Sequence, residues 1–243
     1  MNYLLDSHTH TLASGHAYST LLENARAASE RGLALLCITD HAPGMPCTTH
    51  KYYFQNMKVV DRRLFGVEIL MGAELNLMDF QGGVDLEPAL LRRLDMAIVS
   101  MHRQCMPVTG DCQANTQALI AAMDNPFVSV IGHPDDGKYP LDYPALVRAA
   151  GERGVLLEVN NSSLTPGCYR DNAPANCAAM LQICRKEGVP VVVGSDAHFI
   201  SAVGAHQYAE ELFQALDFPR ELVVNADPER FCAMVRARRA QAG

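Results

Sequence analysis

The chain has 243 residues, of which 49% are hydrophobic, and its formal net charge is −7. This length and composition suit an ordered globular protein, and the negative charge argues against a nucleic-acid groove because phosphate backbones attract basic surfaces. A small phosphorylated ligand remains compatible with that charge, since bound divalent cations would reverse it locally.

Strand-like and helix-like segments alternate along the chain. Apolar runs predict seven strands, at 3–6, 33–39, 69–74, 96–101, 128–132, 155–160 and 189–194. Thr20 and Glu23 form a capping-box pattern that opens a helix, and Gly32 follows its end. Helical spacing predicts further helices at 115–123, 143–153, 175–187, 206–216 and 228–239, the last docked on the outside. The segments 42–53 and 105–115 are expected to be long loops.

Continuous apolar strands separated by helices are typical of parallel strands buried on both faces. Seven repeats favour a closed or nearly closed, TIM-like α/β barrel over an open sheet. No low-complexity linker or composition shift divides the chain, so we expect one domain over 1–243.

The chain carries no sign of export or membrane insertion. It enters strand-like sequence at once, without the basic and apolar regions of a signal peptide, and no apolar run reaches the roughly 18 residues of a membrane span. The eight cysteines are scattered and form no CxxC pair, so we expect reduced thiols and a cytoplasmic location. No membrane or nucleic-acid partner is expected, and the sequence is compatible with a homo-oligomer.

Seven of the nine histidines lie in short clusters where the predicted strands end, beside one glutamate and one aspartate. Imidazole and carboxylate are the usual ligands of zinc and similar ions, and a catalytic zinc takes about three protein ligands. So many ligands at the end where barrels place their chemistry predict a multinuclear, hydrolytic metal site. The candidate ligands are His8, His10, His16, His41, Glu74, His102, His133, Asp196 and His198.

The spacing of these residues predicts how they meet. His8 and His10 are two apart and point to the same side of an extended strand, and Asp196 and His198 repeat that spacing on the last strand. If the barrel closes, the two pairs become neighbours. Glu74 can then bridge two ions about 3.5–4 Å apart, with His102 and His133 completing the second.

Four further residues near the clusters need an interpretation. Asp6 and Asp40 are candidates for orienting a ligand from behind, because metal-bound histidines usually require such a partner. His50 lies in a loop where exposure is favoured over substrate contact. His206 begins a helix and is expected to be an ordinary surface residue.

The motifs carry a resemblance to the PHP (polymerase and histidinol phosphatase) superfamily. They are His8-Thr-His10, Thr39-Asp40-His41, Gly132-His133-Pro134 and Asp196-Ala-His198. Within the superfamily the chain most resembles the YcdX-like metal-dependent phosphatases, through the stretches 16–20, 115–118, 133–139 and 158–163. The resemblance covers essentially the whole chain and implies a distorted (β/α)7 barrel with three metal ions, usually zinc, with manganese or iron as alternatives.

The resemblance also implies how the ligands divide among the ions. The first ion would take His8, His10, Glu74 and Asp196, the second Glu74, His102 and His133, and the third His16, His41 and His198. Every ligand position is filled. The loop after His102 is the part that does not align with the family.

The leading hypothesis is a phosphatase, a phosphoric monoester hydrolase, acting on small phosphorylated molecules. A water between the first two ions, converted to hydroxide by its lowered pKa, would attack phosphorus in line with the leaving alcohol. Arg103, Lys138 and Arg170 are the cations nearest the predicted rim and are candidates to contact the substrate, although an ordinary solvated charge is favoured for each. Histidinol-phosphate phosphatase and phosphodiesterase activities are the nearest alternatives.

Three other functions fit less well. Amidohydrolases commonly use fewer ions and often a bridging modified lysine, and no lysine here ends a predicted strand. Non-catalytic PHP domains usually lose ligands, whereas this chain keeps the whole set. A nuclease would need a basic, aromatic-lined groove, which the acidic balance disfavours.

Overall fold

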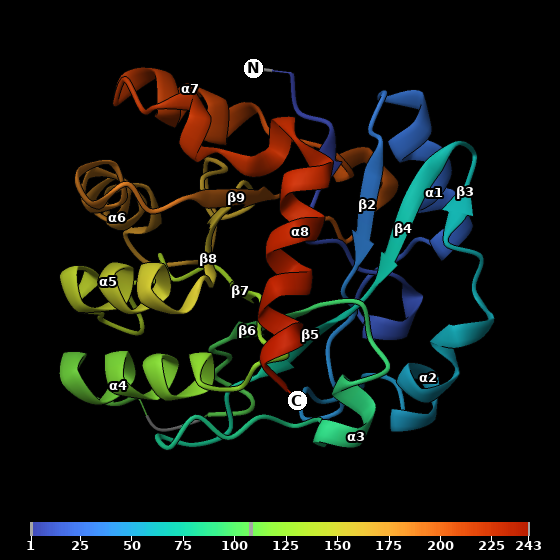
Figure 1. Ribbon diagram of the computed structural model, residues 1–243, viewed down its shortest axis with the longest axis horizontal. Helices are drawn as coiled ribbons and strands as arrows, with labels where there is room; N and C mark the ends of the chain where they lie inside the picture. The colour runs from blue at the N-terminus through green and yellow to red at the C-terminus, as the bar shows by residue number, and fades with distance from the viewer. Residues whose placement is uncertain (1, 107–108, 243) are drawn as a thin grey trace.

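The computed structural model describes residues 2–106 and 109–242 and shows a mixed α/β fold (Figure 1). A four-stranded sheet has the order β1-β2-β4-β3 and a five-stranded sheet the order β5-β6-β7-β8-β9. The strands are β1 Leu5–Asp6, β2 Leu35–Ile38, β3 Arg63–Leu64, β4 Val67–Met71, β5 Ala73–Asn76, β6 Ala97–Ser100, β7 Val130–Ile131, β8 Leu156–Asn160 and β9 Val191–Gly194. All strand pairs are parallel except β3 with β4.

The helices follow the strands as the sequence predicts for parallel pairing. They are α1 Leu21–Glu30, α2 Lys51–Asn56, α3 Pro88–Leu91, α4 Cys112–Met123, α5 Tyr143–Arg153, α6 Ala173–Glu187, α7 Gln207–Ala215 and α8 Pro228–Arg239. The capping box of α1 is confirmed, since the Thr20 side chain accepts from the Glu23 amide and the Glu23 carboxylate accepts from the Thr20 amide. Within the described residues, no helix combines the length and the apolar character needed to cross a membrane.

The single strand predicted over 69–74 is wrong in one respect, because it is interrupted at Gly72 and forms two strands, β4 and β5. The segment before it, β4, pairs with β2, and the segment after it, β5, pairs with β6. A side chain at residue 72 would place its Cβ only 2.8 Å from the Met96 carbonyl oxygen, so this close approach requires glycine. One predicted strand therefore serves both sheets.

Two single bridges join the sheets at the carboxyl ends of their strands. Thr9 pairs with Ala197, and His41 pairs with Glu74. The His10 amide donates to the Ala197 carbonyl at 2.9 Å, so the first and last predicted strands are neighbours here, as expected. Closure of all strands into one continuous barrel stays a prediction.

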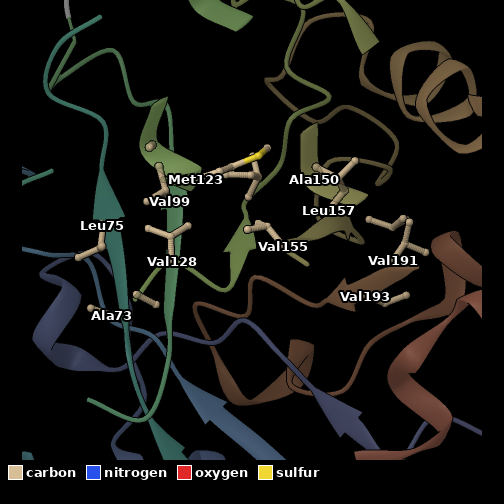
Figure 2. Close-up of a cluster of buried hydrophobic side chains, with 14 of the residues drawn as sticks. Ala73, Leu75, Val99, Met123, Val128, Ala150, Val155, Leu157, Val191 and Val193 are labelled. Atoms are coloured by element: carbon tan, nitrogen blue, oxygen red, sulfur yellow. The ribbon is translucent and has the colours of Figure 1, made fainter. Parts of the chain in front are cut away.

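Hydrophobic side chains fill both faces of the strands. On the helix side, Val99 and Leu157 pack with Met123 of α4 and Ala150 of α5 (Figure 2). On the other face, six strands (β1, β2, β6, β7, β8 and β9) contribute to a second cluster, which also includes Phe231 of α8. The strand residues of this inner cluster are Leu5, Leu35, Cys37, Ile98, Val130, Leu156 and Val192, and Met96 joins them from just before β6. The strands are thus buried on both sides, as their continuous apolar sequences predicted.

Helix α8 lies at the surface, as expected from the sequence, but one of its faces is deeply buried. Phe231 is fully buried in the inner cluster, and Arg238, only 4% exposed, donates to the carbonyl groups of Met123 and Val128. The helix therefore covers the amino-terminal ends of the strands and crosses the front of the molecule in Figure 1. This leaves the carboxyl ends of the strands for polar chemistry.

The expected loops are partly wrong as well. Helix α2 begins at Lys51, inside the loop expected over 42–53, with the His50 side chain accepting from the Tyr52 amide as its cap. In the loop expected over 105–115, α4 begins at Cys112, capped by Asp111, and residues 107 and 108 lie outside the described residues.

Candidate metal centre

The nine predicted ligands meet at the carboxyl ends of the strands, in and beneath one cleft. The cleft has a volume of about 770 Å³, a size typical of small-molecule sites. Its lining includes His16, His41, Glu74, His102, His133, Asp196 and His198. His8 and His10 lie beneath it with no exposed surface. The sequence therefore predicted one common location for all of these residues.

Glu74 lies at the centre of the cluster, and its two oxygens face different imidazoles. Oε1 is 3.0 Å from His133 Nε2 and 3.4 Å from His102 Nε2. Oε2 is 2.6 Å from His41 Nδ1 and 3.5 Å from His8 Nε2. Although Oε2 and His41 Nδ1 are so close, both are buried atoms without a hydrogen bond of acceptable geometry. Two adjacent buried atoms that carry lone pairs and lack a hydrogen-bond partner would suit a shared metal ion as its ligands.

Two pairs of imidazoles point their Nε2 atoms at one another. His8 and His10 are 3.0 Å apart at Nε2, and His16 and His198 are 3.1 Å apart. In the second pair each Nδ1 donates to a backbone carbonyl, of Ser14 or Asp196. Because a carbonyl only accepts, the proton of each neutral ring sits on Nδ1 and the facing Nε2 atoms carry lone pairs. A cation between or beside them would relieve this repulsion.

The electrostatics of the cluster favour positive charge at its base. Burial opposes the charged form of His8, but Glu158, Glu74 and Asp196 raise its pKa well above the usual value. His10 behaves oppositely, because burial and the neighbouring His198 lower its pKa well below the usual value. The carboxylates that attract a proton to His8 would attract a metal ion equally. A neutral imidazole such as His10 is the form that ligates.

Glu158 orients His8 from behind, a role that the sequence analysis did not identify. Its Oε1 accepts from His8 Nδ1 at 2.8 Å and its Oε2 accepts from the His133 amide at 2.7 Å. The carboxylate passes over Gly194 of β9, where a Cβ would lie 2.1 Å from Glu158 Oε1. The one signal in the sequence is a charged residue within a strand whose neighbours are apolar.

Asn76 holds His102 in the same way. The His102 Nδ1 atom is 2.7 Å from Asn76 Oδ1, and the Asn76 amide donates to Asp85 Oδ2. Asp85 also accepts from the Gly44 amide. These bonds leave His102 Nε2 directed toward Glu74, and neither supporting residue was predicted from the sequence.

Asp6 and Asp40 differ in the role predicted for them. Asp6 accepts from backbone amides, those of Ser195 at 2.9 Å, Gly204 at 2.7 Å and the candidate ligand His8 at 3.4 Å, and from no imidazole ring among the described residues. Asp40 accepts from the Ser14 hydroxyl, which in turn contacts His10 Nδ1 at 2.9 Å. Asp40 therefore supports the imidazole ring of a candidate ligand, whereas Asp6 bonds to the backbone of one.

Arg170 is not the solvated charge that the sequence favoured. It is 7% exposed, and its guanidinium donates to Asp196 Oδ2 and to the Ser163 hydroxyl, both at 2.9 Å. Asp196 Oδ1 remains directed at His10 Nε2, 3.2 Å away. Asp196 also has a left-handed backbone with φ of 55°, and residues held in such conformations cluster at functional sites.

Arg103 and Lys138, predicted to lie near the rim of the site, line the cleft. Arg103 is exposed, whereas Lys138 is half-buried and its ammonium donates to the Tyr169 carbonyl. The same ammonium lies 5.0 Å from the centre of the Tyr169 ring. Arg170, which lines the same cleft, contacts the candidate ligand Asp196 directly.

The two histidines without a predicted metal role have different environments. His50 is exposed, as expected. His206 is only 6% exposed, so the expectation of a surface residue is wrong: it packs against the Tyr3 ring, with centroids 4.7 Å apart. Burial lowers its pKa.

The residues present fit bound zinc. Geometry places three overlapping ligand sets within binding distance: His8, His10 and Glu74; His10, His41 and His198; and His41, Glu74 and His102. Imidazole nitrogen and carboxylate oxygen are common zinc ligands, and the free Nε2 lone pairs supply them. These sets share residues differently from the family arrangement, since His41 stands beside both Glu74 and His198.

Two family models match the sequence, the PHP domain over residues 6–162 and the PHP-associated region over residues 175–216. A protein of Caldanaerobacter subterraneus subsp. tengcongensis named "probable phosphatase" is 43% identical over 243 residues, covering 100% of this chain and 95% of its own. A "probable phosphatase" of Clostridium novyi is 41% identical over 238 residues, covering 98% of this chain and 96% of its own.

Solved structures show the same fold at low sequence identity. The histidinol phosphate phosphatase of Lactococcus lactis, complexed with zinc, L-histidinol and phosphate, has a TM-score of 0.57 and 17% identity over 89% of this chain and 95% of its own. A chain of archaeal ribonuclease P, solved with mature tRNA, has a TM-score of 0.58 and 14% identity over 96% of this chain and 91% of its own.

Proposed function

Because this chain belongs to the PHP domain family, we propose that it is a phosphoric monoester hydrolase with a site for three zinc ions. The observation that carries this proposal is Glu74, a buried carboxylate whose two oxygens face two different groups of imidazoles. One such residue can hold two ions at a fixed separation, which is the arrangement that phosphoryl transfer uses. The phosphatase names of the relatives support the reaction class.

The protein's own residues prepare the site. The ions, when bound, supply a nucleophilic water at neutral pH and neutralise charge on the phosphate. Glu158 and Asn76 fix the rings of His8 and His102 so that their Nε2 atoms face the cluster. Arg170, held by Asp196 in the cleft wall, would donate to a phosphate oxygen.

The cleft volume implies a substrate larger than phosphate alone. Arg103 and Lys138 line the cleft, where they would contact the rest of a small phosphorylated molecule. The negative net charge of the chain supports a small substrate over a nucleic acid.

We propose further that the chain is one domain whose strands close into a distorted seven-stranded barrel, with β4 and β5 acting as one strand. The bridges Thr9–Ala197 and His41–Glu74 support closure between the two sheets. The ladder of β8 with β9 supports a single domain, because it joins the segments matched by the two family models. A crystal structure with continuous density would test both points.

The function is tested with an aryl phosphate as substrate and elemental analysis of protein purified without chelator. We expect more than two equivalents of metal, loss of turnover on chelation, and recovery when zinc is added. In oxygen-18 water the label should enter the released phosphate, because water attacks phosphorus. Label in the alcohol, or turnover that survives removal of metal, would contradict the proposal.

A further inference from the structure

Asp40 is a fully buried carboxylate whose hydrogen-bond partners are all uncharged. Its Oδ1 accepts from the Thr11 amide at 2.6 Å and the Ser14 hydroxyl at 2.7 Å. Its Oδ2 accepts from the Thr11 hydroxyl at 2.8 Å and the Tyr53 hydroxyl at 2.6 Å. Burying a charge is costly unless such bonds satisfy it. A carboxylate that gathers four donors beside the metal cluster therefore calls for a functional explanation.

The Ser14 hydroxyl connects Asp40 to two candidate ligands. It has one hydrogen and two lone pairs, and its hydrogen must go to Asp40 because a carboxylate only accepts. Its lone pairs then accept from the His41 amide at 3.1 Å and from His10 Nδ1 at 2.9 Å. The one hydrogen and both lone pairs of the Ser14 hydroxyl are therefore used, and the direction of each of its three hydrogen bonds is fixed.

This pattern determines the tautomer of His10. Since Nδ1 must donate to Ser14, the neutral ring carries its proton there and Nε2 keeps a lone pair. That Nε2 atom lies 3.0 Å from His8 Nε2 and 3.2 Å from Asp196 Oδ1, inside the cluster. Reversal of the tautomer would point an N–H at the position where a metal ion must sit.

Tyr53 links the same carboxylate to the wall of the cleft. It belongs to α2, and the segment just before that helix contributes Met45 and Pro46 to the cleft lining. Burial and the neighbouring Asp40 raise the pKa of the Tyr53 hydroxyl, so it remains a donor. Displacement of this wall would pull on the carboxylate that holds Ser14.

We propose that Asp40 is a positioning residue that sets His10 and His41 for metal binding through Ser14, and that Tyr53 couples the Met45–Pro46 wall of the cleft to it. This inference rests on the proposed function in that the cluster must bind zinc. It adds the prediction that a residue without contact to metal or substrate controls both metal affinity and the cleft wall.

The direct test is a zinc competition titration against a chromophoric chelator, using the full-length protein. Ser14→Ala should weaken binding of at least one zinc ion by about 10–100-fold, the usual effect of losing a partner behind a ligand. The matched control is Ser129→Ala, which removes the same atom from a buried serine whose hydroxyl has no hydrogen-bond partner among the described residues. The control should bind zinc as the wild type does.

The outcomes separate this inference from the function beneath it. A wild type that binds no zinc would overturn both. A wild type that binds zinc, with a folded Ser14→Ala protein of unchanged affinity, would overturn the positioning role alone. Should Ser14→Ala not fold, ring nitrogen-15 spectra of wild type stripped of metal decide instead: the proposal requires His10 to carry its proton on Nδ1, and a proton on Nε2 would refute it.

The coupling to the cleft wall has its own test. Tyr53→Phe should raise KM for an aryl phosphate several-fold and weaken zinc binding, because both the wall and the carboxylate lose one contact. The control is Tyr3→Phe, which deletes a similar hydroxyl–carboxylate bond, to Glu210 at 2.7 Å, away from the cleft. If Tyr53→Phe matches this control in KM and in zinc affinity, Tyr53 does not couple the two.

Discussion

Replacing Glu74 by glutamine should damage the site more than removing one of its histidines. The carboxylate oxygens face separate imidazoles, Oε1 toward His133 at 3.0 Å and Oε2 toward His41 at 2.6 Å. Glutamine keeps one oxygen, while its NH2 group donates and cannot bind a metal ion. The substitution therefore removes a ligand from one side and the negative charge from both.

The magnitude follows from this shared position. Loss of a partner behind a ligand typically reduces metal affinity or activity about 10–100-fold. Glu74 contacts the ions directly in the proposed site and serves two of them, so its loss should exceed the upper end of that range. A decrease in kcat/KM of more than about 100-fold corresponds to more than about 2.7 kcal/mol. His16→Ala should cost less, because His16 is an exposed residue at the edge of the cluster.

The assay is kcat/KM with an aryl phosphate, with zinc content measured on the same preparations. Glu152→Gln, an exposed glutamate of α5, provides the control for the chemical change alone. Glu74→Gln with wild-type kcat/KM would refute the bridging role. If Glu74→Gln loses less activity than His16→Ala, the ligands of the third ion, which include His16, matter more for catalysis than the bridging carboxylate.

Three more perturbations test the support of the site and the fold. Glu158→Gln should weaken zinc binding about 10–100-fold, because His8 loses its anionic partner; unchanged binding in competition titrations would contradict this. Phe231→Ala should lower the free energy of unfolding by about 3–5 kcal/mol, because it leaves a cavity in the inner cluster; urea denaturation measures this free energy. The lowered pKa of His206 means that the unfolded chain binds more protons below about pH 6.5, so stability falls on acidification. His206→Gln should show a shallower fall in Tm between about pH 7 and 5, and parallel curves would exclude a contribution from His206.

The fold was predictable where local signals define an element. Helices α5 and α8 occupy the predicted residues, because an aspartate caps each start and proline stands in each first turn. The break at Gly72 was not predictable, since it depends on the Met96 carbonyl, which approaches from another strand. The position of α8 over the strand ends likewise depends on the space between six strands that are distant in the sequence, which no local sequence pattern predicts.

The candidate ligands were predictable for a different reason. Most of them lie within four residues after a strand, so strand polarity places them at one end of the sheet; Glu74 lies within β5, and His16 follows β1 at a greater distance. Ser14 and Asn76 carry no such signal, because a serine or asparagine in that setting is unremarkable until its partner is known. The division of the ligands among the ions was predicted from the family resemblance alone. The position of His41 beside both Glu74 and His198 follows from the distances in the structure.

Gly194 shows that a missing side chain can be part of a metal site. Glu158 reaches His8 only across the bare backbone of this residue, where a single methyl group would lie 2.6 Å from the Cβ of His8. In a map of mutational tolerance Gly194 should therefore rank with the imidazoles, although it could never ligate anything. During divergence the glycine and the glutamate should be retained or lost together, and a relative with alanine at this place should have found another way to hold its first histidine.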